Sequence, residues 1–196
     1  MIGAIVLAAG SSSRMGRPKA TLTLGPLGRT FVEAITETLD AAGVVAMRVV
    51  VAPGLDRLYR NGVTNPDPSA GMLSSVQCGL RAFPKNLEAV LVWPVDHPLV
   101  ERQTIVAMIA AFRTGEASIV VPTHDGRRGH PVLFTAGVFP ELLTADPSSG
   151  ARAVVHAHDD RLELAVFDPG VIADIDTPDD YARHCGSSVP SSTESP

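Results

Sequence analysis

The chain has 196 residues, 45% of them hydrophobic, and a formal net charge of -5 at neutral pH. This length and composition fit one globular domain with a sizeable core. The mild acidity gives no general attraction to nucleic acid or anionic membranes, so an anion-binding site must come from a local cluster of cations. No apolar run approaches the ~20 residues needed to cross a bilayer.

The two cysteines, Cys78 and Cys185, stand far apart and belong to no metal-binding pattern. So few cysteines in so long a chain argue against a disulfide framework and favour a reduced, cytoplasmic setting. The apolar stretch 2–9 is short and has no basic segment before it, unlike a secretory signal peptide. We therefore expect a cytoplasmic protein with no membrane partner and no nucleic-acid partner.

The first half of the chain alternates between two hydrophobic patterns. Continuous apolar runs are typical of parallel strands covered on both faces, and apolar residues at a spacing of three or four are typical of helices. In chain order these patterns predict a strand at 4–8, a helix at 31–43, a strand at 47–52, a helix at 74–83 and a strand at 89–95. This alternation predicts an α/β fold.

The second half is less regular. The same patterns predict a helix at 105–112, strands at 118–121, 132–135 and 162–167, helices at 138–143 and 151–158, and a last helix from Pro178. We expect a mixed, mostly parallel sheet with an inserted hairpin. The final GSSVPSSTESP is rich in Gly, Ser and Pro, so we predict one domain at 1–186 and a disordered tail at 187–196.

The stretch VLAAGSSSRMGRPKATL, residues 6–22, carries the strongest functional signal. Ligands of open α/β sheets lie beyond the carboxyl ends of the strands, and Gly10 follows the first predicted strand directly. Glycines allow close backbone approach, and Arg14 and Lys19 can neutralise phosphate charge, so the loop suits a polyphosphate. Its spacing is neither that of a Walker A loop nor GxGxxG. A solvent-exposed turn with incidental cations is the alternative.

Three aspartates stand where strands end or a helix begins. Asp96 ends an apolar strand, where a carboxylate needs a cation, so it could ligate a metal or cap the next helix. Asp174 and Asp176 lie two apart in DIDTPDD, hence on one face of an extended segment. Asp176 or Thr177 could instead cap the helix that begins near Pro178.

Two further loops carry residues suited to ligand contacts. NPDPSAGMLSS has prolines that stiffen it, Gly71 for close backbone approach, and Ser75 at a helix start. HDGRRGHPV sets Arg127, Arg128 and His130 in a Gly-rich loop that could hold a phosphorylated acceptor. A plain turn with a helix cap and an ordinary hairpin tip are the structural alternatives.

Two other features are interpreted as structural. HAHDD at 156–160 clusters histidines and carboxylates, but His156 and His158 are expected on different faces of a helix end, which disfavours a metal site. Trp93 lies within a predicted strand and is expected in the core.

LAAGSSSRMGRPK matches the pattern L-A-A-G-x-S-x-R-M-G-x-x-K, and the chain resembles the molybdenum cofactor nucleotidyltransferases (MocA/MobA-like family), their cytidylyltransferase branch most closely. NPDPSAGMLSSVQCGL, VDHPLV, GRRGHPV and DIDTPDDY follow in that family's order and approximate spacing. The resemblance covers nearly the whole chain except the tail. It implies a single-domain, Rossmann-like three-layer α/β/α nucleotidyltransferase fold with a mostly parallel mixed sheet.

The resemblance also implies catalytic and metal-binding roles. Arg14, Lys19 and Asp96 would be catalytic, with the two cations facing the triphosphate. Asp96 and Asp174 would bind Mg²⁺. Asp176 would cap the following helix or support the metal ligands without touching the metal.

Substrate contacts are implied in the same way. The acceptor would contact Arg128, Gly129 and His130, because Gly-His-Pro marks the cytidylyltransferase branch. The nucleotide would contact Leu7, Ala8, Ala9, Gly10, Ser12, Arg14, Lys19, Asn65, Gly71 and Ser75. The implied reaction moves a cytidylyl group from CTP to the phosphate of molybdopterin and releases pyrophosphate. A molybdenum hydroxylase or dehydrogenase would receive the product.

Two alternatives stay open. A guanylyltransferase, or another nucleotidyltransferase of the superfamily, would use the same chemistry, but Ala9 disfavours guanine because guanylyl enzymes of this family typically have glycine there. A carrier could instead hand the cofactor to a dehydrogenase without catalysis, although the intact charged motifs disfavour this. A dinucleotide-dependent dehydrogenase is disfavoured because the glycine fingerprint is absent.

Overall fold

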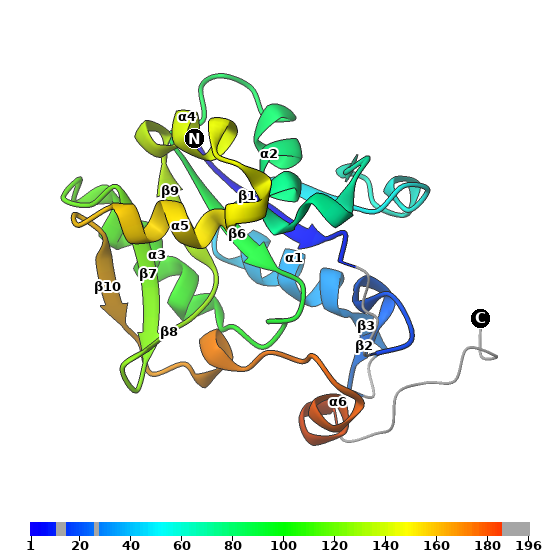
Figure 1. The fold of residues 1–196 in the computed structure, drawn as a ribbon. Helices are drawn as coiled ribbons and strands as arrows, with labels where there is room; N and C mark the ends of the chain where they lie inside the picture. Colours follow the sequence, from blue (N-terminus) through cyan, green and yellow to red (C-terminus); the bar gives the residue numbers. More distant parts are fainter. Residues whose placement is uncertain (11–14, 26–27, 186–196) are drawn as a thin grey trace.

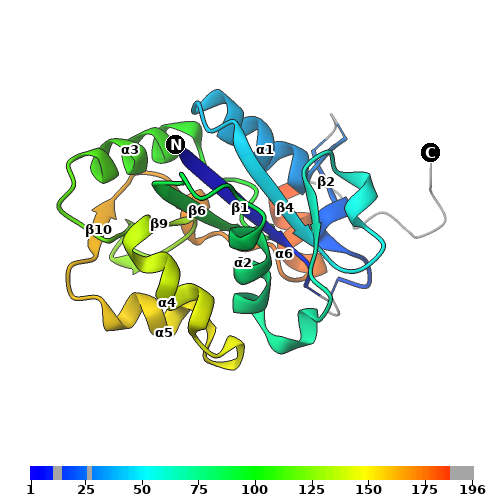
Figure 2. The ribbon, with the colours of Figure 1, turned by 90° about the horizontal axis from the view of Figure 1, so that it is seen from above.

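The computed structural model describes residues 1–10, 15–25 and 28–185, which form a central sheet with helices on both faces (Figures 1 and 2). The helices are α1 (Phe31–Ala41), α2 (Met72–Arg81), α3 (Arg102–Arg113), α4 (Phe139–Thr144), α5 (Gly150–Ala157) and α6 (Pro178–Cys185). The strands are β1 (Ile2–Ala8), β2 (Thr23–Leu24), β3 (Arg29–Thr30), β4 (Ala46–Val51), β5 (Gly62–Thr64), β6 (Ala89–Pro94), β7 (Ile119–His124), β8 (Arg127–Arg128), β9 (Val132–Thr135) and β10 (Leu162–Ala165).

The main sheet runs in the order β10-β7-β9-β6-β1-β4-β5, and β8 pairs with β7. β1 is parallel to both β4 and β6, and β10 is parallel to β7. β9 runs antiparallel to β6 and β7, and β8 runs antiparallel to β7. The expected mixed, mostly parallel sheet with an inserted hairpin is therefore confirmed.

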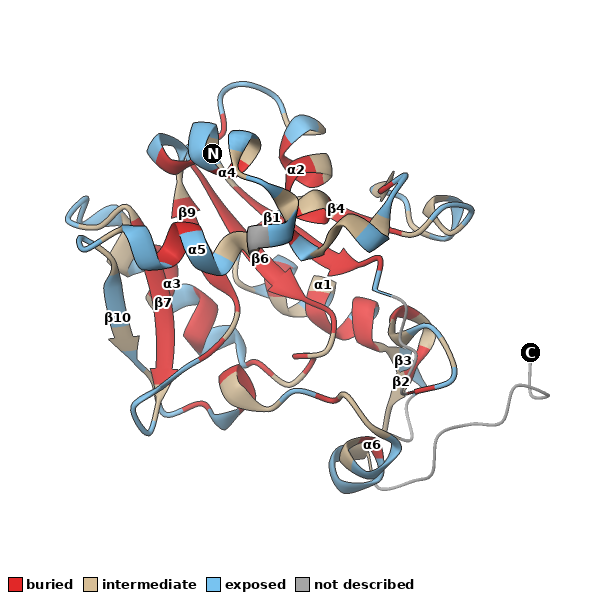
Figure 3. Ribbon diagram, viewed as in Figure 1, coloured by how far each residue is buried: buried red, intermediate tan, exposed pale blue. Residues whose placement is uncertain are grey.

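The side chains of β1 alternate between two apolar layers. Ala4, Val6 and Ala8 belong to the cluster that contains residues of α1, α3 and α6, whereas Ile5 and Leu7 belong to the cluster with α2, α4 and α5. Figure 2 shows these helices on opposite sides of the sheet, and Figure 3 shows the buried strands between them. Burial of a side chain such as Ile5 contributes ~1.5–3 kcal/mol, so both layers fix the strands that carry the site.

The predicted strands and helices all have counterparts, with bounds that differ by a few residues. β5, β8 and the small β2–β3 sheet were not predicted, because strands of two or three residues carry too little pattern. Within the described residues no helix is long and apolar enough to cross a membrane. The predicted tail at 187–196 lies outside the described residues, and the domain boundary stays a prediction.

Candidate active site

A cavity of about 390 Å³ lies where the adjacent parallel strands β1 and β6 end. The chain continues from β1 to β4 on one side and returns to β6 on the other, which makes this the switch point where open α/β sheets bind ligands. We call it the switch-point cavity. Seven of the predicted nucleotide residues line it: Leu7, Ala8, Ala9, Gly10, Lys19, Gly71 and Ser75.

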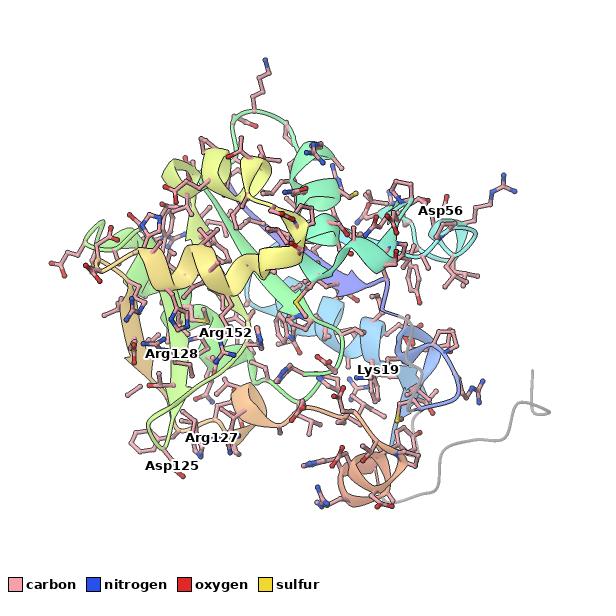
Figure 4. The ribbon with its side chains drawn as sticks, viewed as in Figure 1. Lys19, Asp56, Asp125, Arg127, Arg128 and Arg152 are labelled. Atoms are coloured by element: carbon pink, nitrogen blue, oxygen red, sulfur yellow. The ribbon has the colours of Figure 1, made fainter. Side chains whose placement is uncertain are left out.

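Lys19 and two aspartates form the charged centre of this cavity (Lys19 is labelled in Figure 4). Lys19 Nζ donates to Asp96 Oδ2 at 3.2 Å and to Asp176 Oδ1. The three side chains are only 11%, 25% and 22% exposed, so water screens these ion pairs less than pairs on the open surface. Among the described residues two carboxylates and one ammonium meet here, and carboxylates are ligands that a divalent cation prefers.

Asp96 has one oxygen left for such a cation. Its Oδ1 is buried and has no hydrogen-bond partner among the described residues, and His97 Nε2 lies 3.8 Å from it. The turn that carries Asp96 is fixed by a bond from Val95 N to Leu7 O and by Trp93 Nε1, which donates to His97 O at 2.9 Å. Trp93 is fully buried, as predicted.

In the 174–177 segment the two aspartates lie in different surroundings. Ile175 N donates to Asp96 O at 2.8 Å, which places the segment beside β6. Thr177 Oγ1 accepts from Asp180 N while Asp180 Oδ2 accepts from Thr177 N, a reciprocal cap at the start of α6. Thr177 is therefore the cap, and Asp176 reaches Lys19 and the switch-point cavity. Asp174 does not line that cavity, and its charge acts on His97 instead.

The loop before α2 supplies the opposite wall. Gly71 has φ +106°, and a Cβ there would lie 2.9 Å from Pro147 O, so the position requires glycine. Asn65 is buried, and its Nδ2 donates to Ser74 Oγ at 2.8 Å and Ser75 Oγ at 2.9 Å. Asn65 thus braces the loop and is not on the cavity wall, whereas Gly71 and Ser75 are. Ser12 and Arg14 lie outside the described residues.

A second cavity, of about 510 Å³, holds the predicted acceptor residues Arg128, Gly129 and His130. We call it the hairpin cavity, because these residues follow the β7–β8 turn. Gly129 N donates to Pro122 O and His130 N donates to Val171 O, both at 2.8 Å, so the segment is pinned on two sides. Met72 lines both cavities, which therefore adjoin.

Two histidines lie between the charged centre and the hairpin cavity. The rings of His97 and His130 are 4.9 Å apart. Burial lowers the pKa of His97, and burial together with His97 lowers the pKa of His130 to about 4. His130 is therefore neutral near pH 7 and acts as a hydrogen-bonding group rather than as a cation.

Sequence reasoning missed some lining residues of the hairpin cavity. Arg152 and His156 of α5 line it. The only signal for Arg152 was its place on a predicted helix, and His156 was considered only as part of HAHDD. His158 points elsewhere, because its Nε2 bonds Glu141 and its Nδ1 bonds Asp160. Among the described residues no group of three His, Cys, Asp or Glu side chains is placed to hold a metal, and the structural interpretation of HAHDD stays a prediction.

Comparisons with known proteins match most of the chain. Residues 4–162 match the model of the family described as MobA-like NTP transferase domain. The crystal structure of Rv0371c from Mycobacterium tuberculosis H37Rv in complex with manganese is 26% identical, with a TM-score of 0.76, and the match covers 95% of this chain and 98% of that one.

The curated relatives carry several names. A nicotine blue oxidoreductase of Paenarthrobacter nicotinovorans is 33% identical over 163 residues, which cover 76% of this chain and 78% of that protein. A molybdenum cofactor guanylyltransferase of Rhizobium meliloti is 32% identical over 170 residues, 80% and 75% of the two chains. The molybdenum cofactor cytidylyltransferase of Escherichia coli is 27% identical over 190 residues, 92% and 93% of the two chains.

Proposed function

This chain belongs to the MobA-like NTP transferase family, and from that premise we propose that it moves a cytidylyl group from CTP to the phosphate of molybdopterin. The observation that carries the proposal is the switch-point cavity, where predicted nucleotide residues meet Lys19, Asp96 and Asp176. Its volume of about 390 Å³ is in the range of small-molecule sites.

The proposed chemistry needs no covalent enzyme intermediate. The acceptor phosphate attacks the α-phosphorus of CTP, and the bond from that phosphorus to the pyrophosphate oxygen breaks. Because the acceptor phosphate is already an oxyanion near neutral pH, the protein need not supply a general base. Lys19 binds the triphosphate and stabilises the charge that grows on the leaving pyrophosphate, and Arg14 is proposed to share this task. The backbone at Ala9 and Gly10 orients the nucleotide.

A divalent cation, with Mg²⁺ as the proposed ion, belongs to this reaction. The manganese complex of the relative Rv0371c supports a divalent metal. Asp96 and Asp176 fit such an ion, because both carboxylates line the cavity and Asp96 Oδ1 is buried without a partner among the described residues. We propose Asp176 rather than Asp174 as the second ligand. When bound, the ion would neutralise phosphate charge as a Lewis acid.

Cytosine is proposed over guanine on the basis of Ala9. Ala9 lines the cavity, and we propose that its methyl group takes space that glycine would leave to a larger base. The relatives include a molybdenum cofactor cytidylyltransferase and several guanylyltransferases, and a guanylyl reaction is therefore the main competitor. The relative named as an oxidoreductase suggests another class of enzyme for this chain. The charged centre fits phosphoryl groups, and the dinucleotide-binding pattern GxGxxG is absent from the sequence, so we favour the transferase.

The test is a direct product assay. The protein is incubated with Mg²⁺, molybdopterin and labelled CTP or labelled GTP, and the dinucleotide and pyrophosphate are identified. We expect the cytosine dinucleotide with one pyrophosphate for each turnover. A guanine dinucleotide would show that the nucleotide is GTP and not CTP. Binding of the cofactor without release of pyrophosphate would favour a carrier.

The proposal extends to the cellular setting of the reaction. A molybdenum hydroxylase or dehydrogenase is proposed to receive the product. A reducing, cytoplasmic setting is proposed from the two free cysteines, Cys78 and Cys185.

A further inference from the structure

The hairpin cavity combines two arginines and two histidines with an apolar floor. Arg128, His130, Arg152 and His156 line it, and among the described residues no Asp or Glu does. The floor is formed by side chains of the sheet and of α5: Val92, Val121, Val132, Phe134 and Val155. A cavity with this composition fits a flat or apolar molecule that carries a negative charge.

The two arginines of this cavity differ in their contacts. Arg128 Nε donates to Glu163 Oε1 at 2.8 Å, so a carboxylate already balances its charge. Arg152 is exposed, and in the part of the chain that the structure describes its side chain has no hydrogen bond or ion pair. Figure 4 shows the two labelled arginines close together beneath α5. Arg152 is therefore the guanidinium that a ligand can reach without breaking an existing pair.

The place of Arg152 in α5 is electrostatically unfavourable in the absence of a ligand. It is the third residue of the helix, and Gly150 and Ala151 before it also line the cavity. The first turn of α5 contains no acidic residue. Because a helix N-terminus carries partial positive charge, it repels an arginine and stabilises an anion. An anion bound here would remove the conflict.

His130 gives an independent indication of a ligand. Its Nδ1 is buried and has no hydrogen-bond partner within the described ranges, although the ring lines the same cavity. Buried polar atoms are nearly always paired, so an unpaired one in a ring beside a cavity points to a missing hydrogen-bond partner.

We propose that Arg152 binds the phosphate of the acceptor in the hairpin cavity and thereby selects phosphorylated over unphosphorylated acceptors. This inference rests on the proposed function and names the residue that recognises its second substrate. Because Met72 lines both cavities, an acceptor held by Arg152 lies beside the nucleotide.

The test uses a pterin with a phosphomethyl side chain and its hydroxymethyl counterpart, whose own fluorescence reports binding. We expect the unmodified protein to bind the phosphorylated probe about 10- to 100-fold more tightly, the range for a hydrogen bond to a charged group. Arg152→Gln should abolish this preference, and Arg152→Lys should keep part of it.

In the transfer reaction Arg152→Gln should raise KM for the acceptor and leave KM for CTP unchanged. Arg81→Gln, the same charge change at the exposed end of α2, is the matched control and should bind both probes normally.

The outcomes separate this assignment from the proposed function. If Arg152→Gln keeps the preference for phosphate, or the unmodified protein has none, the assignment is wrong, even where transfer to molybdopterin occurs. If binding depends on Arg152 but no nucleotide is ever transferred, the assignment stands and the proposed reaction is wrong.

Discussion

The switch-point cavity and the hairpin cavity share Met72, yet they are built by different means. The first consists of backbone at the ends of β1 and β6 around Lys19, which donates hydrogen bonds to Asp96 and Asp176. The second consists of an apolar floor and two arginines, one from β8 and one from α5. The difference teaches that the proposed nucleotide site joins one loop motif to aspartates from distant segments, whereas the proposed acceptor site depends on the packing of α5 against the sheet.

Loss of a carboxylate from the charged centre should have the largest effect. Asp96→Asn and Asp176→Asn are each expected to lower kcat by at least about 10²–10³-fold, as for loss of one preorganised electrostatic group. Asp174→Asn is the matched control, because Asp174 does not line the switch-point cavity, and it should cost far less. Steady-state rates with circular dichroism to verify folding provide the measurement. Equal losses at 174 and 176 would remove the distinction between the two aspartates.

Lys19 tests whether the same centre also binds the triphosphate. Lys19→Ala should slow turnover at saturating CTP by about 10²–10³-fold, or ~2.7–4 kcal/mol, because its ammonium faces charge that grows on pyrophosphate. Arg14→Ala is expected to have an effect of similar size. Lys85→Ala, which removes an exposed lysine beyond α2, is the control. Normal turnover of the Lys19 variant would exclude its role in the transition state.

Gly71 tests how strictly the backbone shapes the switch-point cavity. Gly71→Ala should destabilise the fold by ~1–3 kcal/mol, because alanine rarely adopts this conformation and its Cβ would meet Pro147 O. Gly10→Ala is the control, since a Cβ there meets nothing within 4 Å. Urea denaturation measures the difference in the free energy of unfolding. If the two variants are equally stable, the loop before α2 can accommodate a Cβ at position 71, and Gly71 is not required there.

Ala9 should give the smallest effect. Ala9→Gly is expected to relax the preference for CTP over GTP without reversing it, because one methyl group in a pocket is worth only ~1–3 kcal/mol. The measurement is the ratio of kcat/KM for the two nucleotides. An unchanged ratio would show that Ala9 plays no part in selecting the base.

The sequence predicts the switch-point cavity better than the hairpin cavity for a physical reason. Leu7 to Gly10 and Lys19 lie in one motif, and β1 brings Leu7 to Gly10 to the end of the sheet, where Lys19 contacts Asp96 and Asp176. The difference between Asp174 and Asp176 could not be predicted, because it depends on the cap that Thr177 and Asp180 form. Arg152 carried no signal beyond its place on a predicted helix, since only the packing of α5 against the sheet brings it to the cavity.

Many more residues of the fold than of the site could be predicted. Buried strands such as β1 and β6 are continuous apolar runs, so their positions follow from the hydrophobic pattern alone. Asn65 shows the limit of such reasoning, because the resemblance implies a nucleotide contact for it, whereas its amide donates to Ser74 and Ser75 and the contact stays a prediction.

The most direct test of the central claim is a crystal structure with CTP and Mg²⁺. The triphosphate should lie in the switch-point cavity beside Lys19, with the base near Ala9 and the metal against Asp96 and Asp176. A nucleotide bound elsewhere, or a metal away from both aspartates, for instance at His156 and His158, would contradict the proposed mechanism.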